Sequence, residues 1–373
     1  MAQHLQLDLK VAYCTLRGAN PAYDSEFNTT VQWDIPLLEG YDWVEVPNRG
    51  TGSESFLGLH NPGLWKLIRQ GHFDAVLMYL GYLRSSFWIS YFACKLSHTA
   101  FLFGTDATTL VPMAGHKWKK HLKRVVWPFL YRLASQVTVP SNGTRDLMLS
   151  LGIPEERITL TSYSVNNDWW LARSQEIDRT AVRASWEVTA ETPVILYCAK
   201  LQPWKRPQDL LEAFAQSDLT EAVLIFAGEG PLRSDMMKKA VALGIADRVR
   251  FLGFVNQTQL PALYTASDLL VLPSSYEAFG VVVNEDYLCG CPVVASDHVG
   301  AARDLIAPVD PGLIYPCGDV RALSKLLSEL LRDRGHLFEL GRAARNRMDS
   351  WSPKDTVTGT VAAVGAALRR CEG

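Results

Sequence analysis

The sequence predicts an α/β protein built from two doubly wound domains. Short β-rich runs such as DAVLMYL and QVTVPS alternate with helical patterns such as NGTRDLMLSLG in the first half, and this βαβ rhythm is typical of a parallel sheet. The rhythm pauses at the polar stretch 164–180 and restarts at residue 193. With 373 residues, 48% of them hydrophobic, the chain is long enough to bury two cores.

The expected strands follow one another along both halves. In the first half they span 9–16, 74–80, 99–105, 136–141 and 157–163, and in the second 193–200, 222–228, 248–254, 269–275, 291–296 and 312–316. The boundary is predicted near Asp168 to Glu176, which gives a first domain over 1–170 and a second over 171–351. An amphipathic helix over 352–373 is expected to pack back on the first domain.

Composition narrows the class of protein. The formal net charge of -2 gives no overall attraction to nucleic acid. Among the scattered cysteines only Cys289 and Cys291 lie close together, in a spacing that fits neither a zinc site nor a thioredoxin-type pair, so we expect a reducing, cytoplasmic compartment. The N-terminus lacks the charged start and apolar run of a signal peptide. The longest apolar stretch, 85–103, is interrupted by Lys95 and His98, so we expect no transmembrane segment.

Two lysines and two glycines follow strands of the second half. Doubly wound sheets bind ligands beyond the carboxyl ends of their strands. Lys200 ends the strand PVILYCAK, and Lys205 follows in the next loop. A pair of ammonium groups at this place suits a diphosphate. The alternative is a solvated basic loop.

Gly228 and Gly230 follow the next strand and would let backbone approach a ligand. They match neither the dinucleotide fingerprint nor a P-loop, so an ordinary tight turn is the alternative.

The most specific stretch is SSYEAFGVVVNEDYLCGCPVVAS, which begins at Ser274. It predicts a strand end, a loop with Glu277, and a helix that starts near Phe279 or Gly280 and stops at Gly290. The free N–H groups at 279–282 and the helix dipole would form a phosphate seat.

Two carboxylates flank this seat. Glu285 lies in the second turn, where it would reach a ribose diol, and Glu277 would face a sugar ring. The alternative is that both carboxylates only favour a helix N-terminus, an effect worth under about 1 kcal/mol each.

Several ordered stretches together resemble the C-terminal domain of family 4 retaining glycosyltransferases of GT-B architecture. The resemblance spans Pro193 to Ile306 and is carried by AKLQPWKRPQDLLEAF, LIFAGEGPLR, VRFLGFVNQTQLPALYTASDLLVLPS and the stretch from Ser274. RLASQVTVPSNGTRDLMLSLGIPEERITL is similar to the close of that family's N-terminal domain. The resemblance implies two Rossmann-like domains that face each other across a cleft.

Carried over to this sequence, the resemblance implies a donor-binding role for a set of residues in the second domain. Lys200, where the family usually has Arg, and Lys205 would bind the donor diphosphate; Glu277 would contact the donor sugar; Ala278, Phe279, Gly280 and Val281 would line the seat; Glu285 would bind the ribose; and the backbone at Phe254 and Val255 would hold the base, with Gly228 and Gly230 nearby.

The first half departs more from the family. Many members have a Gly-Gly loop after the first strand, and here Gly18 and Asn20 are the nearest equivalents on the acceptor side. Many also carry a His after the strand TAFLFGTD, where this chain has Asp106. Two interpretations of Asp106 stay open: a catalytic group, together with Glu277, Lys205 and Lys200, or a surface capping residue.

The resemblance implies a retaining transferase. The sequence shows no metal cluster with suitable ligand spacing, so we expect the enzyme to be metal-independent and without a cofactor. It would move a sugar from a UDP- or GDP-sugar to a hydroxyl of a glycan, lipid-linked or small-molecule acceptor, as in bacterial polysaccharide or glycolipid biosynthesis. Lysines and helix amides would neutralise the diphosphate in place of a metal. The alternatives are a nucleotide-sugar epimerase of the same architecture and a non-catalytic sugar-nucleotide binding protein.

One further segment, GHKWKKHLKRVVWPFLYRLAS over 115–135, mixes cations with aromatic residues. It suggests either peripheral contact with an anionic membrane or a helix that packs its aromatic stripe into the first domain and leaves a solvated basic face.

Overall fold

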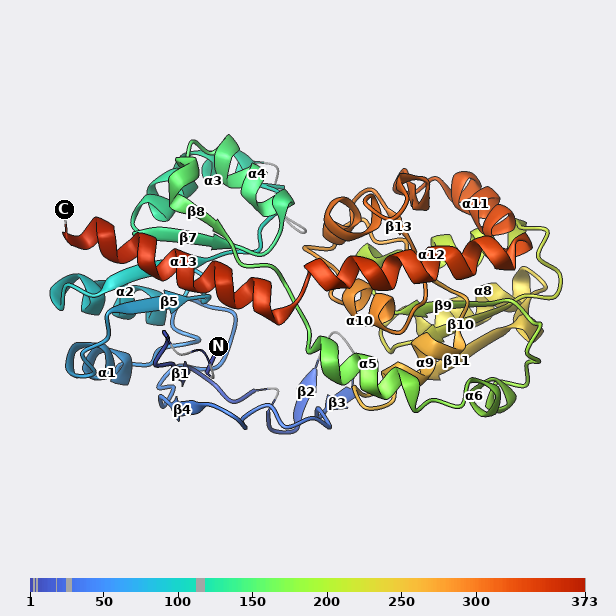
Figure 1. Ribbon diagram of the computed structural model, residues 1–373, viewed down its shortest axis with the longest axis horizontal. Coiled ribbons are helices and arrows are strands. Elements are labelled where there is room, and N and C mark those ends of the chain that lie inside the picture. The colour runs from blue at the N-terminus through green and yellow to red at the C-terminus, as the bar shows by residue number, and fades with distance from the viewer. Residues whose placement is uncertain (3, 5, 18, 25–28, 112–117, 373) are drawn as a thin grey trace. The chain divides into compact units, whose positions relative to one another are not determined.

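The computed structural model describes residues 1–372 except 3, 5, 18, 25–28 and 112–117. The chain divides into two compact units (Figure 1). The first unit comprises 1–20, 36–163 and 354–373, and the second comprises 21–35 and 164–353.

The first unit contains a parallel sheet in the order β5-β6-β7-β8 and a separate parallel pair, β1 with β4. Helices connect the four strands of the β5-β6-β7-β8 sheet (Figure 1), as expected for parallel pairing. The elements are β1 Lys10–Tyr13, β4 Asp42–Glu45, α1 Gly63–Gln70, β5 Ala75–Met78, α2 Ser85–Leu96, β6 Ala100–Gly104, α3 Trp118–Arg132, β7 Gln136–Val139, α4 Asn142–Ser150, β8 Ile158–Leu160 and α13 Pro353–Glu372.

The first unit has an aromatic core, in which buried Phe87 of α2 packs against Phe101 and Phe103 of β6. Helix α13 adds to this unit, because Ala363 and Ala367 pack against buried β6 side chains.

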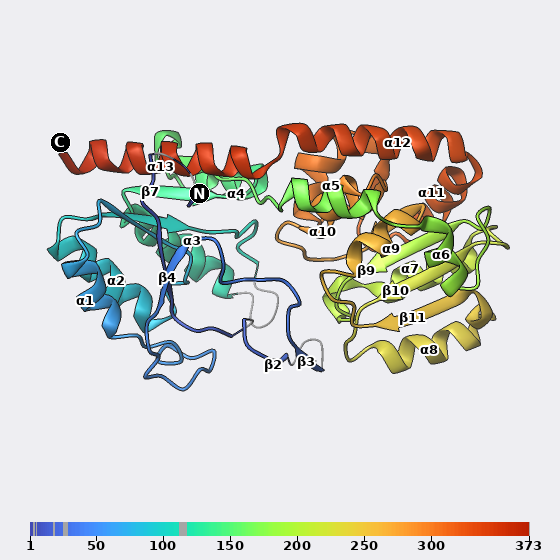
Figure 2. The same cartoon turned by 60° about the horizontal axis from the view of Figure 1, so that its bottom comes forward.

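The second unit is built around a six-stranded parallel sheet in the order β11-β10-β9-β12-β13-β14. Figure 2 labels β9, β10 and β11 of this sheet. A short antiparallel pair, β2 with β3, belongs to the same unit. The elements are β2 Ala22–Asp24, β3 Thr29–Val31, α5 Asn167–Gln175, α6 Arg179–Ser185, β9 Val194–Cys198, α7 Pro207–Gln216, β10 Val223–Ala227, α8 Arg233–Ala242, β11 Val249–Gly253, α9 Leu260–Ala266, β12 Leu269–Leu272, α10 Val282–Leu288, β13 Val293–Ser296, β14 Ile314–Tyr315, α11 Val320–Arg332 and α12 Arg334–Arg347.

The eleven strands that the sequence predicts all form, and the parallel, Rossmann-like organisation is confirmed. Strands β9, β10 and β12 read as continuous apolar runs because helices cover both faces of such a sheet. Strand order reverses between β9 and β12, since β10 and β11 lie on one side of β9 while β13 and β14 lie beyond β12. This reversal is a topological switch point, where the loops at the carboxyl ends of the two strands diverge and leave a crevice.

Candidate functional site

The loops after β9 and β12 bring together two of the predicted residues. Lys205 ends a 3₁₀ turn that spans Pro203–Lys205 after β9, and Glu277 lies in the loop after β12. Their side chains form an ion pair. Only 16% of the Lys205 side chain and 19% of the Glu277 side chain are exposed, so the pair is less screened by water than a surface pair. A charged, partly buried pair therefore marks the switch point.

Backbone hydrogen bonds hold these loops in place. The Ser275 N–H donates to the Trp204 carbonyl over 2.8 Å, which ties the loop after β12 to the loop after β9. The Gly300 N–H donates to the Glu277 carbonyl over 3.0 Å. The Ala301 N–H donates to the Phe279 carbonyl over 2.7 Å. Glu277 is thus carried by a loop that is fixed on two sides.

The predicted helix start is wrong by two to three residues. Helix α10 begins at Val282 rather than at Phe279 or Gly280, and it ends at Leu288. The reason is the backbone of Gly280, whose φ of +99° lies outside the helical region and in the region that favours glycine. The predicted seat at 279–281 is therefore a loop that enters the helix, and the Phe279 side chain turns inward to stack on Trp351.

Gly228 and Gly230 allow the loops after β9 and β10 to pack closely. A Cβ atom on Gly228 would lie 2.0 Å from the Ala199 carbonyl oxygen, and one on Gly230 would lie 2.6 Å from that of Leu201. The Leu201 N–H also donates to the Glu229 carbonyl over 2.8 Å. These glycines let the loop after β10 support the loop that carries Lys200.

Glu285 of α10 is buried beside Tyr264 of α9. The Tyr264 hydroxyl donates a hydrogen bond to Glu285 Oε2 over 2.9 Å. Burial raises the pKa of Glu285 to about 7, while hydrogen bonds from Tyr264 and Gln257 act in the opposite direction. The carboxyl group can therefore change its charge near neutral pH. Tyr264 was not predicted, although a tyrosine on an otherwise apolar helix face is the signal that points to it.

The segment 21–35 contacts residues that the sequence assigns to the nucleotide. Lys200 Nζ lies 3.3 Å from Asp24 Oδ2. The ring of Trp33 lies 6.1 Å from that of Phe254, centroid to centroid. Asn256, next to Val255, donates to the Gln32 carbonyl over 2.7 Å. Sequence reasoning missed Asp24 and Trp33, because nothing local in the sequence pairs them with residues so far along the chain.

The residues predicted for the acceptor side belong to the first unit. Asp106 is exposed in the loop after β6, and its Oδ2 accepts a hydrogen bond from the Tyr163 hydroxyl over 3.4 Å. No described helix begins at Asp106. The Asn20 N–H donates to the Leu16 carbonyl over 3.2 Å. Gly18 lies outside the described residues. The roles predicted for these residues stay predictions.

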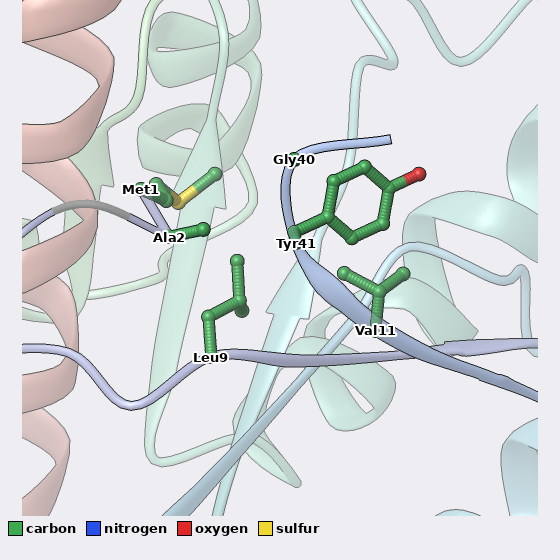
Figure 3. Close-up of a pocket in the computed structure, with 6 residues that line it drawn as sticks. All are labelled: Met1, Ala2, Leu9, Val11, Gly40 and Tyr41. Carbon is green, nitrogen blue, oxygen red and sulfur yellow. The ribbon is translucent and has the colours of Figure 1, made fainter. Parts of the chain in front are cut away.

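An apolar pocket of about 360 Å³ lies in the first unit (Figure 3). Among the described residues that line it, only Tyr41 has a polar side chain. The pocket is lined by Met1, Ala2, Leu9, Val11, Gly40 and Tyr41.

The described residues contain neither a metal-ligand group nor a membrane-spanning helix. In this part of the chain no three His, Cys, Asp or Glu side chains are grouped so that they could hold a metal ion. None of the helices described here has the length and apolar character needed to cross a membrane.

Two family matches cover nearly the whole chain. Residues 178–347 match "Glycosyl transferases group 1", and residues 1–168 match "Glycosyltransferase Family 4". The chain belongs to the family 4 glycosyltransferases. The first match includes four residues predicted for the donor site of this glycosyltransferase: Lys200, Lys205, Glu277 and Glu285.

Curated relatives match different lengths of this glycosyltransferase. The 2-deoxystreptamine N-acetyl-D-glucosaminyltransferase of Streptomyces fradiae is 40% identical over 119 residues, which are 32% of this chain and 28% of the relative. The D-inositol 3-phosphate glycosyltransferase of Mycobacteroides abscessus is 28% identical over 341 residues, 89% of this chain and 73% of the relative. The match to the enzyme of the same name from Salinispora arenicola covers only 41% of that relative.

Solved structures show the same fold. A glycosyltransferase from Rickettsia africae superposes with a TM-score of 0.72 at 17% identity, over 88% of this chain and 85% of the other. HepE from Anabaena, in complex with UDP and glucose, superposes with a TM-score of 0.69 at 21% identity, over 87% and 86% of the two chains. The fold of this glycosyltransferase is therefore GT-B, with two Rossmann-like domains.

Proposed function

We propose that this glycosyltransferase moves a sugar from a nucleotide-diphosphate donor, a UDP- or GDP-sugar, to an acceptor hydroxyl. The observation that carries the proposal is the ion pair of Lys205 with Glu277 at the switch point. Cleavage of the glycosidic bond increases negative charge on the leaving diphosphate, and a fixed cation stabilises that charge most in the transition state. An ammonium group has three N–H donors, so Lys205 can hold Glu277 and a phosphate oxygen at once.

The other residues of the second unit complete the proposed donor site. Lys200 assists Lys205 on the diphosphate, and the amides at 279–281 face the phosphates. Glu277, fixed through its backbone carbonyl, accepts hydrogen bonds from hydroxyls of the donor sugar. Glu285, oriented by Tyr264, binds the ribose, and the backbone at 254–255 holds the base. In HepE the same fold was crystallised with UDP and glucose, which supports a uridine nucleotide as the first donor class to test.

We include retention of anomeric configuration and independence from metal in the proposal. Retention rests on the resemblance of the stretch around Glu277 and Glu285 to retaining members of the family. Metal independence rests on the lysines, which supply the positive charge that a divalent cation would otherwise provide. All seven cysteines are free thiols, which favours action in the cytoplasm, at or near the inner face of the membrane.

The acceptor is a glycan, a lipid-linked sugar or a small polyol. Two relatives are named for the acceptors 2-deoxystreptamine and D-inositol 3-phosphate, and both names describe cyclic polyols. Small cyclic polyols are therefore the first acceptors to test.

The first experiment is calorimetry with UDP and GDP, which needs no acceptor. We expect one of the two to bind, and Glu285→Ala to weaken that binding by about 1.5–3 kcal/mol, the range for a hydrogen bond to a charged group. Unchanged affinity in Glu285→Ala would contradict the ribose assignment.

The second experiment incubates the protein with the matching nucleotide sugars, with and without polyol acceptors, in the presence of a metal chelator. NMR of the product then reports the anomeric configuration. Turnover of the donor to an epimer without acceptor, or donor binding without any transfer, would contradict the proposal.

A further inference from the structure

Helix α3 of the first unit carries two apolar stripes. One consists of Trp127, Leu130 and Tyr131, which are buried in the core of the unit. The second stripe points to solvent. It consists of Trp118, Leu122, Val125 and Phe129, which are 56%, 49%, 63% and 67% exposed. Their spacing of four, three and four residues places them on one side of the helix. The core accounts for the first stripe and leaves the second without a function in folding.

Helix α2 extends this exposed stripe into a wider surface. A shallow groove of about 430 Å³ lies between α2 and α3. Phe92 of α2 is 52% exposed and forms ring contacts with Trp88 and Tyr91. The groove is lined by Trp88, Tyr91, Phe92, Val125, Val126, Phe129, Leu130 and Leu133. We call the exposed side chains Phe92, Trp118, Leu122, Val125 and Phe129 the α2–α3 face.

The surroundings of the α2–α3 face are strongly basic. Between Arg84 and Ser135 the sequence contains a single acidic residue, Asp106, although the chain as a whole has a formal net charge of -2. Lys119, Lys120 and Arg124 are exposed on α3, the helix that carries the stripe. A contiguous exposed apolar surface on a helix that also carries exposed cations is unusual for a monomeric domain and marks an interaction site.

We propose that the α2–α3 face docks on an anionic lipid surface. The aromatic and aliphatic side chains enter the boundary between headgroups and acyl chains, while the lysines and Arg124 reach the lipid phosphates with their long side chains. A second copy of this chain is a poorer occupant, because a two-fold contact would place the cations of one copy against those of the other. The proposal does not rest on the glycosyl-transfer activity, since it concerns the first unit alone.

Vesicle flotation of the full chain tests this proposal. One set of vesicles contains phosphatidylcholine alone, and the other contains phosphatidylcholine mixed with phosphatidylglycerol. We expect the protein to float with the anionic vesicles only, and we expect the bound fraction to fall as the salt concentration rises.

Two variants separate the charged from the apolar contribution. Replacing three cations in Lys119→Gln/Lys120→Gln/Arg124→Gln is expected to weaken partitioning by about a hundredfold. The double variant Val125→Ser/Phe129→Ser is expected to weaken it by at least about tenfold. Both sets of side chains are exposed, so thermal unfolding of the variants should match the parent protein.

Matched controls come from the second unit. Val241→Ser/Phe338→Ser removes two side chains that are 68% and 71% exposed, and Lys238→Gln/Lys325→Gln removes two lysines with 78% and 77% exposed side chains. Neither control should change flotation.

Equal flotation with neutral and anionic vesicles, no flotation with either, or an equal loss in the control variants would overturn the proposal. So would a dimer, seen by light scattering, that dissociates in Val125→Ser/Phe129→Ser while vesicles bind nothing.

Discussion

The loops after β9 and β12 in the second unit and the loop after β6 in the first unit present charged residues in different settings. Lys205 and Glu277 are mostly buried, paired with each other, and held by loops whose backbone groups bond to neighbouring loops. Asp106 is exposed, and the Tyr163 hydroxyl lies at a long 3.4 Å from it. A charge that is fixed and shielded from water interacts more strongly with a ligand than a mobile, solvated one.

From this difference we expect most of the ligand-binding energy to come from the second unit. In the second unit, backbone hydrogen bonds hold the loops that carry the charged pair, while the charged group after β6 in the first unit is exposed. Variants that disturb the fixed charges should therefore affect catalysis and affinity most, and variants of peripheral contacts should affect them least.

The largest effect is expected for Lys205→Ala. Loss of one preorganised cation should lower the transfer rate by about a hundredfold to a thousandfold, with a smaller change in donor affinity, because the cation acts on charge that grows during the reaction. Lys205→Arg should recover part of the rate, since a guanidinium keeps the charge but not its compact position.

Steady-state kinetics and donor calorimetry measure these two quantities for Lys205→Ala. Lys238→Ala on the exposed face of α8 is the control. If Lys205→Ala lost affinity and kept its turnover, Lys205 would be a ground-state anchor only.

The next largest effect is a pH dependence of the free energy of unfolding, which arises from Glu285. Its pKa is raised from 4.5 to about 7 in the folded protein, so between these values the folded state binds more protons than the unfolded chain. The free energy of unfolding should therefore fall as the pH rises through this window, by about 3 kcal/mol in total, and stay lower above pH 7. Glu285→Gln should remove this loss.

Urea unfolding across the pH range measures the effect of Glu285→Gln. Burial also raises the pKa of Asp286, and the charge of Glu285 raises it further, so the difference between the two profiles includes this coupling. Glu339→Gln, at an exposed surface pair, is the control. Parallel pH profiles for the parent protein and Glu285→Gln would contradict the assignment of a raised pKa.

A smaller effect is expected for Tyr264→Phe, which removes the hydrogen bond to Glu285. Nucleoside diphosphate affinity should fall by about 1 kcal/mol, the net value of one hydrogen bond, and the pKa of Glu285 should rise further. The matched control is Tyr131→Phe, which removes a buried hydroxyl bonded to Thr105 in the first unit. Equal loss of stability in both variants without any loss of affinity would assign Tyr264 a structural role only.

The smallest effect is expected for Asp24→Asn. Asp24 and a diphosphate compete for the Lys200 ammonium, so removal of the carboxylate charge should strengthen diphosphate binding. The gain should not exceed about 1 kcal/mol, because the pair is partly exposed, and it should shrink at high salt. Asp42→Asn, which breaks the exposed pair with Lys10, should leave affinity unchanged. Weaker binding in Asp24→Asn would show that Asp24 supports the site.

The sequence predicted the strands of the two main sheets well and did not predict the pair β2 with β3. Each strand of the two main sheets coincides with an apolar run, because burial on both faces leaves a strong local pattern. Strands β2 and β3 lie outside these sheets, and their sequences AYD and TTV contain no apolar run that would predict a strand. The start of α10 was predicted too early because the sequence does not reveal the positive φ of Gly280.

The sequence alone determined the α/β class, the βαβ order and the residue types at the switch point, because hydrophobic periodicity and loop chemistry are local properties of the chain. Only the tertiary structure decided which side chains meet. Pairing of Lys205 with Glu277, and of Tyr264 with Glu285, depends on β9 lying next to β12 and on how α9 packs against α10. The same holds for α3, whose sequence shows two apolar stripes but not which one the core buries. Side-chain partners are selected by packing between distant segments, and packing of that kind leaves no periodic signal in a single sequence.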